Sequence, residues 1–250
     1  MLWEEWSKLE DIGIELVIGE AILWYGFAGV GKTRFSAYFP TLLLYRYLKD
    51  NNKLTDKTTF VVINTDRSFS LRDLRKLCEA NGISFQAIQK HLWLEKVRSM
   101  QELLSTCHAV FRAIKEKRND VKLIAIDKVN DPYFEDIISF EDKSRFLSHS
   151  RELTGDLTEL LKKLLAYADD YGILVSLSAR RRKPKPGQQF KRWYQEIYAG
   201  YVIQYAPSVV VRLEKVSEIG SKAKLKVVKN RHGEEGGELI VKFTDYGFKV

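Results

Sequence analysis

The sequence has few of the residues that build disulfide frameworks, metal clusters or membrane spans. Its two cysteines, Cys78 and Cys107, are isolated, and its four histidines are scattered, so no spacing typical of a disulfide-rich or zinc protein is present. No apolar run is long enough to cross a membrane, and the acidic, aromatic start is unlike a secretory signal. We expect a cytoplasmic protein with no membrane partner, in which both cysteines are small buried side chains.

The remaining composition is that of a globular protein, with 45% hydrophobic and 30% charged residues over 250 positions. Strand and helix patterns alternate in the first two thirds, which predicts an α/β fold with a mainly parallel central sheet flanked by helices. The later strands look antiparallel and predict an extension at one sheet edge, with hairpins at 219–221 and 233–237. We expect residues 1–250 to form a single domain. The predicted strands are 21–25, 59–65, 123–127, 173–178, 208–216, 223–228 and 238–243.

Two segments carry apolar residues at helical spacing and predict long amphipathic helices, 97–114 and 153–168. A further helix pattern follows the first strand and contains Pro40. Because proline lacks a backbone N–H and clashes with the preceding turn, we expect this helix to kink or end near Phe39.

A glycine-rich segment lies between the first predicted strand and this helix. It fits the pattern G-x-x-x-x-G-K-[ST], in which glycines let backbone N–H groups point at phosphates from a helix N-terminus. The lysine of the pattern reaches the β- and γ-phosphates, and the threonine, here Thr33, reaches a magnesium ion. We therefore predict that ATP and Mg²⁺ bind here. The predicted nucleotide-binding residues are Gly26, Phe27, Ala28, Gly29, Val30, Gly31, Lys32, Thr33 and Arg34.

Two acids end apolar strands and complete the chemistry that nucleotide hydrolysis needs. Asp127 follows the strand 123–127, in the arrangement of a Walker B carboxylate that supports the magnesium ion through water. Asp66 follows the strand 59–65 and would reach the same edge of the sheet. We assign Asp66, together with Lys32, to catalysis, with Asp66 orienting the attacking water.

A basic segment follows the strand 173–178. Residues 180–192 contain seven cations and no acid. This segment therefore accounts for most of the net charge of +8 that the whole chain carries. Cations interleaved with aromatic side chains favour single-stranded DNA, since phosphates neutralise the charge and bases stack on the rings. A solvated loop or a contact with an acidic protein partner stays open as an alternative. The predicted DNA-binding residues are Arg180, Arg181, Arg182, Lys183, Lys185, Lys191, Arg192 and Trp193.

The run Val62-Ile63-Asn64-Thr65-Asp66-Arg67-Ser68-Phe69 resembles the segment that carries the catalytic glutamate in RecA-fold recombinases of the archaeal RadA type. The order of motifs is similar too, and the resemblance covers the chain from about Gly13 to its end. It implies a RecA-like P-loop ATPase core. With some twenty residues before the phosphate loop, the chain is more similar to single-domain RadA paralogues of the RadB and RadC type, without a separate helix-hairpin-helix domain.

The resemblance also implies roles for residues outside the phosphate loop. Ser178 stands where the family has an Asn or Gln that senses the γ-phosphate, and the basic segment matches the second DNA-binding loop. Lys229 and Arg231 match cations that reach the γ-phosphate of a neighbouring subunit in trans, although a pair of exposed edge-strand charges is an equal alternative. The Phe-x-x-Ala tether of the family's filaments is missing from the sequence, which leaves a dimer or ring as the expected homo-oligomer.

Together these features predict an ATP-binding RadA paralogue that binds single-stranded DNA and modulates homologous recombination or DNA repair. We expect slow hydrolysis, because Asp66 is one methylene shorter than the family's glutamate. The RadA recombinase is a candidate partner. Two alternatives remain: a KaiC-like regulatory ATPase that acts on a protein partner, and a nucleotide-binding scaffold that does not hydrolyse ATP.

Overall fold

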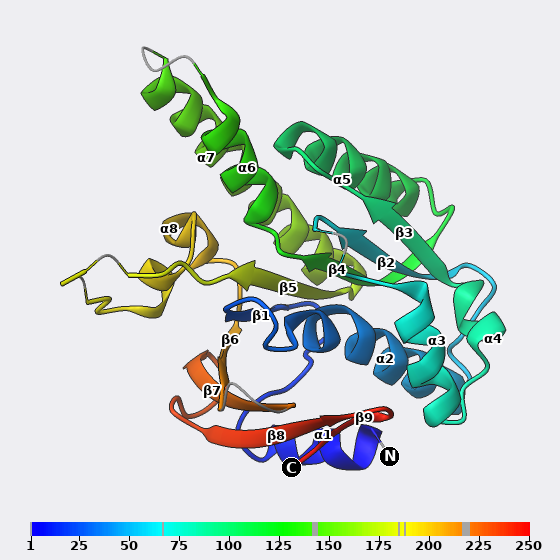
Figure 1. The fold of residues 1–250 in the computed structure, drawn as a ribbon. Coiled ribbons are helices and arrows are strands. Elements are labelled where there is room, and N and C mark those ends of the chain that lie inside the picture. The colour runs from blue at the N-terminus through cyan, green and yellow to red at the C-terminus, as the bar shows by residue number, and fades with distance from the viewer. Residues whose placement is uncertain (1, 67, 142–144, 185, 188, 217–220) are drawn as a thin grey trace.

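The computed structural model describes residues 2–66, 68–141, 145–184, 186–187, 189–216 and 221–250. The described residues form a nine-stranded sheet in the order β3-β2-β4-β5-β1-β6-β7-β8-β9 (Figure 1). Its strands are β1 (Ala21–Gly26), β2 (Thr58–Asn64), β3 (Leu92–Lys96), β4 (Asp120–Asp127), β5 (Leu174–Arg180), β6 (Val209–Lys215), β7 (Lys222–Asn230), β8 (Glu238–Thr244) and β9 (Gly247–Lys249).

The strands from β3 to β6 in this order are parallel, and β7, β8 and β9 continue the sheet as antiparallel strands. The predicted α/β class, with its mainly parallel sheet and antiparallel C-terminal extension, is confirmed. This arrangement is compatible with a RecA-like core. The predicted hairpin at 219–221 falls largely outside the described residues, whereas residues 231–237 connect β7 to β8.

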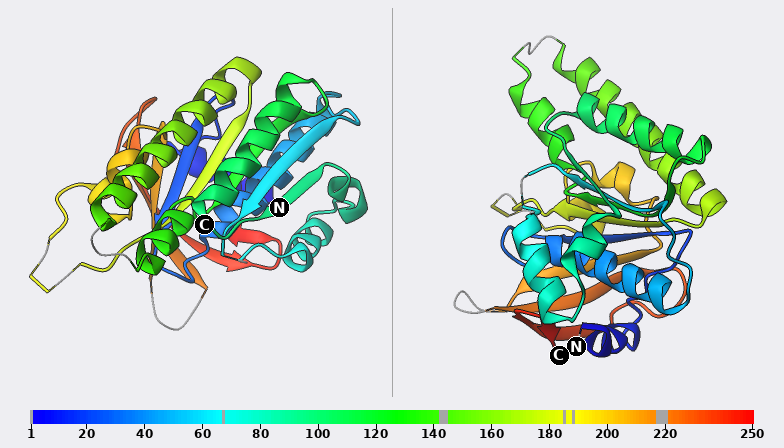
Figure 2. Two further views of the ribbon diagram at one scale, coloured as in Figure 1. Left: turned by 90° about the horizontal axis from the view of Figure 1, so that it is seen from above. Right: turned by 90° about the vertical axis from the view of Figure 1, so that its right-hand side faces the viewer.

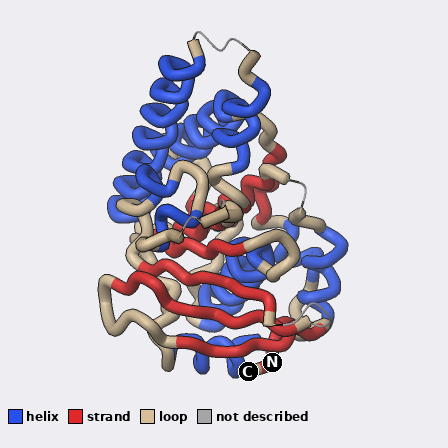
Figure 3. The backbone as a smooth tube through the Cα atoms, turned by 60° about the vertical axis from the view of Figure 1, so that its left-hand side comes forward, coloured by secondary structure: helices blue, strands red, loops and turns tan. Residues whose placement is uncertain are grey.

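Helices cover both faces of the sheet (Figures 1 and 2). One face packs against α1 (Leu2–Glu10), α2 (Phe39–Asp50), α3 (Leu71–Ala80) and α4 (Phe85–Gln89). The other face packs against α5 (Met100–Lys115), α6 (Asp131–Ser139), α7 (Phe146–Tyr171) and α8 (Gly200–Ile203). Because both faces are covered, β1 and β2 are buried along their whole length, which explains their continuous apolar sequences. The Val250 N–H donates to the Glu5 carboxylate of α1 at 2.8 Å, so the C-terminus packs against the first helix, on one side of the molecule (Figure 3).

Successive side chains of β1 point to opposite faces of the sheet and join different cores. Trp24 stacks on Phe35 and belongs to the core shared with α1 to α4, whereas Leu23 and Tyr25 belong to the core shared with α5, α7 and α8. The strand that leads into the phosphate loop is therefore fixed from both sides. Both cysteines are buried as predicted, Cys78 on α3 and Cys107 on α5.

The helix after the phosphate loop does not end near Phe39, so that part of the prediction is wrong. A π-helical stretch, η1 (Arg34–Tyr38), leads directly into α2, and Pro40 lies in the first turn of α2. The Phe39 N–H donates to the Arg34 carbonyl, five residues back, and this wider turn accommodates the proline without ending the helix.

Candidate functional site

The phosphate loop runs from the end of β1 to the helix that begins at Lys32. Gly29 and Gly31 have positive φ angles of 75° and 87°, which other residues rarely adopt. A Cβ atom at Gly31 would collide with the ring of Phe243, and one at Gly26 would collide with the Leu213 carbonyl. A side chain at Gly29 would meet nothing within 4 Å, so this backbone borders open space. The glycine pattern thus follows from the geometry of the loop.

Lys32 is almost fully buried and folds back over the loop, where its Nζ donates to the Phe27 carbonyl at 2.7 Å. Burial, with a smaller contribution from the nearby charge of Lys128, lowers the pKa of Lys32 to about 8. A phosphate group would offer this ammonium a stronger acceptor than the carbonyl does.

Thr33, at the end of the phosphate loop, contacts Asp127. The Thr33 hydroxyl donates to Asp127 Oδ2 at 2.8 Å, and Asp127 is fully buried at the end of β4. The Ser178 hydroxyl donates to Oδ1 at 2.5 Å, Ser36 donates to the same atom at 3.4 Å, and Ser68 donates to Oδ2. These contacts bring Asp127 next to Thr33, at the end of the phosphate loop.

This donor set fits a magnesium ion that is held mainly by phosphates and water. A hydroxyl and a carboxylate are the hard oxygen ligands that Mg²⁺ prefers, and Mg²⁺ commonly uses only one or two protein carboxylates beside the substrate phosphates. The described part of the chain contains no cluster of three or more His, Cys, Asp or Glu side chains suited to a metal ion. Beside the phosphate loop, Thr33 and Asp127 are the residues that would hold the ion.

Asp66 lies at the same edge of the sheet, but its carboxylate is already engaged. Oδ1 accepts the Ser68 N–H at 3.0 Å, and Oδ2 forms an ion pair with the ammonium of Lys128. The sequence interpretation gave Lys128 no role, although a lysine directly after the acid of an apolar strand was a visible signal.

Ser178 and Arg34 contact protein groups rather than the open side of the loop. Ser178 is fully buried; besides donating to Asp127, its hydroxyl accepts the Lys128 N–H at 2.8 Å. The structure thus places Ser178 as a support for Asp127. The Arg34 guanidinium donates to the carbonyls of Thr244 and Gly247 at 2.9 and 3.2 Å and therefore points toward the β8–β9 turn.

The first cations of the basic segment are held by protein groups. Arg180 pairs with Asp131 at 2.7 Å, and Arg181 lies between Glu196 at 2.8 Å and Glu214 at 3.3 Å. Arg180 ends β5 and Arg181 follows it beside the phosphate loop. The Arg181 N–H donates to the Gly26 carbonyl, and its guanidinium covers the Phe27 ring.

The later residues of the segment are more open. Arg182 donates through Nε to the Gln195 carbonyl at 2.5 Å and stacks over Phe190, whereas Lys183, Lys191 and Arg192 are exposed. Trp193 is half-buried, with its ring 6.2 Å from that of Tyr25. Lys185 lies outside the described residues.

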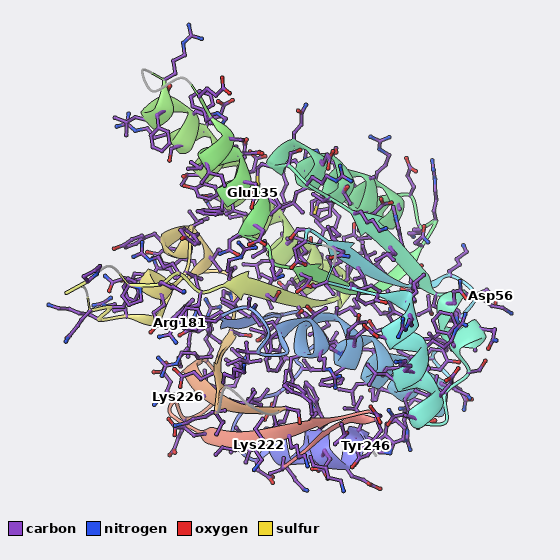
Figure 4. The ribbon with its side chains drawn as sticks, in the orientation of Figure 1. Asp56, Glu135, Arg181, Lys222, Lys226 and Tyr246 are labelled. Carbon is purple, nitrogen blue, oxygen red and sulfur yellow. The ribbon has the colours of Figure 1, made fainter. Side chains whose placement is uncertain are left out.

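A groove of about 840 Å³ lies between this segment, α8 and β7. Figure 4 labels Arg181 and Lys226, which lie on this side of the molecule. Aromatic and cationic side chains dominate the lining, including Phe190, Trp193, Tyr194, Tyr205, Lys191 and Arg192. Flat rings beside cations suit stacked bases joined by phosphates.

Lys229 and Arg231 lie far from the phosphate loop of their own chain. Lys229 pairs with Val210 in the sheet and is level with Leu23, near the start of β1, whereas the loop follows its end. The Lys229 ammonium donates to the carbonyls of Gln204 and Pro207 at 2.9 and 2.6 Å. Arg231 is exposed and donates to the Tyr205 carbonyl at 3.0 Å. Of the two predicted trans cations, Arg231 is thus the more accessible.

None of the helices among the described residues combines the length and apolar composition that a membrane span requires. No protein-family model matches the chain, and no curated protein is significantly similar to it.

Proposed function

We propose that this chain binds ATP with Mg²⁺ and hydrolyses it slowly, as a RecA-like ATPase of the RadA-paralogue type formed by residues 1–250. The contact between Thr33 and Asp127 carries the proposal, because it places beside the phosphate loop the hydroxyl and the buried carboxylate that would hold the ion. The order of the strands and the covered parallel sheet support the same assignment.

In this proposal each residue near the loop has a defined task. The loop amides and Lys32 bind the phosphates, Thr33 and Asp127 hold the ion, and Asp66 orients the attacking water. The bound ion supplies neutralisation of phosphate charge. Slow turnover is expected on two grounds: Asp66 is shorter than glutamate, and its carboxylate is paired with Lys128.

Single-stranded DNA is the second ligand that we propose, in keeping with a cytoplasmic role in recombination or repair. Support comes from the exposed cations Lys183, Lys191 and Arg192 and from the aromatic groove beside them. A single strand would place its phosphates on these cations and its bases on the rings. The RadA recombinase remains the candidate protein partner.

The proposal is tested first by nucleotide binding. Lys32→Ala should abolish binding of MgADP, measured by calorimetry, and should leave salt-dependent DNA binding in place. Equal affinity in the variant would remove the site. Hydrolysis measured with and without single-stranded DNA then separates the alternatives. Stimulation by DNA supports the paralogue, turnover indifferent to DNA supports a regulatory ATPase, and binding without turnover supports a scaffold.

A further inference from the structure

Lys128 has an unusual backbone conformation for a lysine. Its φ angle is +61°, in the left-handed region that side chains other than glycine rarely adopt. Two side chains hold this turn in place: Ser178 accepts the Lys128 N–H at 2.8 Å, and Thr65 donates to the Lys128 carbonyl at 3.1 Å. Backbone conformations that are unfavourable for the residue persist only where the surrounding structure fixes them, and they cluster at functional sites.

The side chain of Lys128 is directed to the place where catalysis would occur. Its ammonium pairs with Asp66, and the side chain is only 12% exposed. In the function proposed above, Asp66 orients the water that attacks the γ-phosphate. An ammonium in contact with Asp66 therefore lies within reach of the same phosphate. Because an ammonium has three donors, one can remain on Asp66 while another takes a phosphate oxygen.

The other cations near the loop are committed elsewhere. Lys32 closes the phosphate loop, and Arg181 is held by Glu196, Glu214 and the ring of Phe27. Arg180 is paired with Asp131, which is almost fully buried. Among the described cations bordering the loop, Lys128 is the one whose partner is the catalytic carboxylate itself.

We propose that Lys128 recognises the γ-phosphate in cis and thereby distinguishes ATP from ADP. This inference rests on the proposed nucleotide site and adds the group that reads the third phosphate. It makes a cation from a second subunit unnecessary for recognition of ATP. Substitution of Lys128 should therefore weaken the binding of nucleoside triphosphates and leave the binding of diphosphates unchanged.

The test compares the affinities of MgADP and of the non-hydrolysable analogue adenylyl imidodiphosphate, both measured by calorimetry. Lys128→Met should weaken binding of the analogue by about tenfold or more, as expected for a lost charge-assisted hydrogen bond, while MgADP affinity changes less than about threefold. Lys128→Arg, which keeps the charge, should restore most of the preference. The matched control is Lys122→Met, which removes a lysine near the start of β4, the strand that Lys128 directly follows.

An unchanged ratio of the two affinities in Lys128→Met, or an equal loss of both, would overturn the inference. Wild-type protein that binds neither nucleotide would instead reject the proposed function as a whole, so the two failures are distinguishable. Binding of MgADP by Lys128→Met also shows that the variant is folded.

Discussion

The hydroxyl of Thr33 donates a hydrogen bond to the carboxylate of Asp127 at 2.8 Å, although 94 positions separate the two residues in the chain. The strand that leads to the phosphate loop, β1, is not a neighbour of β4, because β5 lies between them. The contact is possible because Thr33 stands on the helix after the loop, and β5 contributes Ser178 to the same carboxylate. The candidate metal position thus depends on three strands and one helix.

Asp127→Asn should uncouple nucleotide binding from magnesium. The amide has no charge to orient water around the ion, and its NH₂ group would face hydroxyls that now donate to the carboxylate. We expect Mg²⁺ to strengthen ADP binding by about tenfold in the wild type and by less than about twofold in the variant. Calorimetry with Mg²⁺ and with a chelator measures both. Asp120→Asn, at the other end of β4, should behave as the wild type, and a variant Asp127→Asn with full magnesium dependence would contradict the assignment.

Nucleotide affinity should fall as the pH rises through about 8. The pKa of Lys32 is lowered to about 8 by burial, and phosphate binding requires its charged form. Binding therefore raises this pKa and takes up a proton, so affinity is constant below pH 8 and decreases by up to about tenfold per unit above it.

Dissociation constants of ADP between pH 7 and 9.5 test this dependence. The control is Lys229→Met, because Lys229 also has a pKa lowered to about 8 but lies on β7, level with Leu23 and away from the phosphate loop. The variant should keep the same pH profile. A flat profile in the wild type would show that Lys32 does not titrate against bound phosphate.

The sequence was sufficient for the strands that carry the site, because β1, β2, β4 and β5 are buried on both faces and read as apolar runs. It was not sufficient for β3, an edge strand whose side chains are half-buried or exposed, or for the three-residue β9. The sequence also left open whether the helix kinks or ends near Phe39, and the structure shows that a local π-turn lets it continue past Pro40.

The residues of the candidate site could be predicted only where they belong to a recognisable sequence motif. Thr33 and Asp127 stand in recognisable patterns, so their meeting was foreseeable. The pairing of Lys128 with Asp66 depends on how two strand ends approach one another, and no spacing in the sequence encodes it. Counting charge in the basic segment was misleading for a similar reason, because Glu196 and Glu214, which neutralise Arg181, both lie outside that segment.

The salt dependence of DNA binding should reside in the exposed cations of the basic segment. A triple substitution of Lys183, Lys191 and Arg192 by alanine should reduce the slope of log affinity against log salt by up to about 2, since each phosphate contact on a single strand contributes about 0.7. Titration of a fluorescent oligonucleotide at several salt concentrations measures the slope. Three exposed lysines on another part of the surface, Lys49, Lys53 and Lys57, provide the matched control. A similar reduction of the slope in both triple variants would show that DNA does not bind specifically at the basic segment.

Glu196 should be essential for stability although it has no role in the proposed chemistry. It is 7% exposed, and its carboxylate lies 2.8 Å from Arg181 Nε, accepts a hydrogen bond from Arg212 at 3.2 Å and accepts another from the Tyr25 hydroxyl at 3.3 Å. Glu196→Ala would leave two arginines without this partner in a partly buried place, which costs about 3 kcal/mol of unfolding free energy.

Urea unfolding measures this cost, and Glu159→Ala, which removes an exposed glutamate paired with Lys163 on α7, should unfold as the wild type does. Equal stability of the two variants would mean that the Arg181–Glu196–Arg212 cluster contributes nothing in solution. If the substitution destabilises this cluster, it should also disturb the phosphate loop. Arg181 covers the ring of Phe27, and the Phe27 carbonyl accepts a hydrogen bond from Lys32. We therefore expect Glu196→Ala to weaken ADP binding as well, and Glu159→Ala to leave it unchanged.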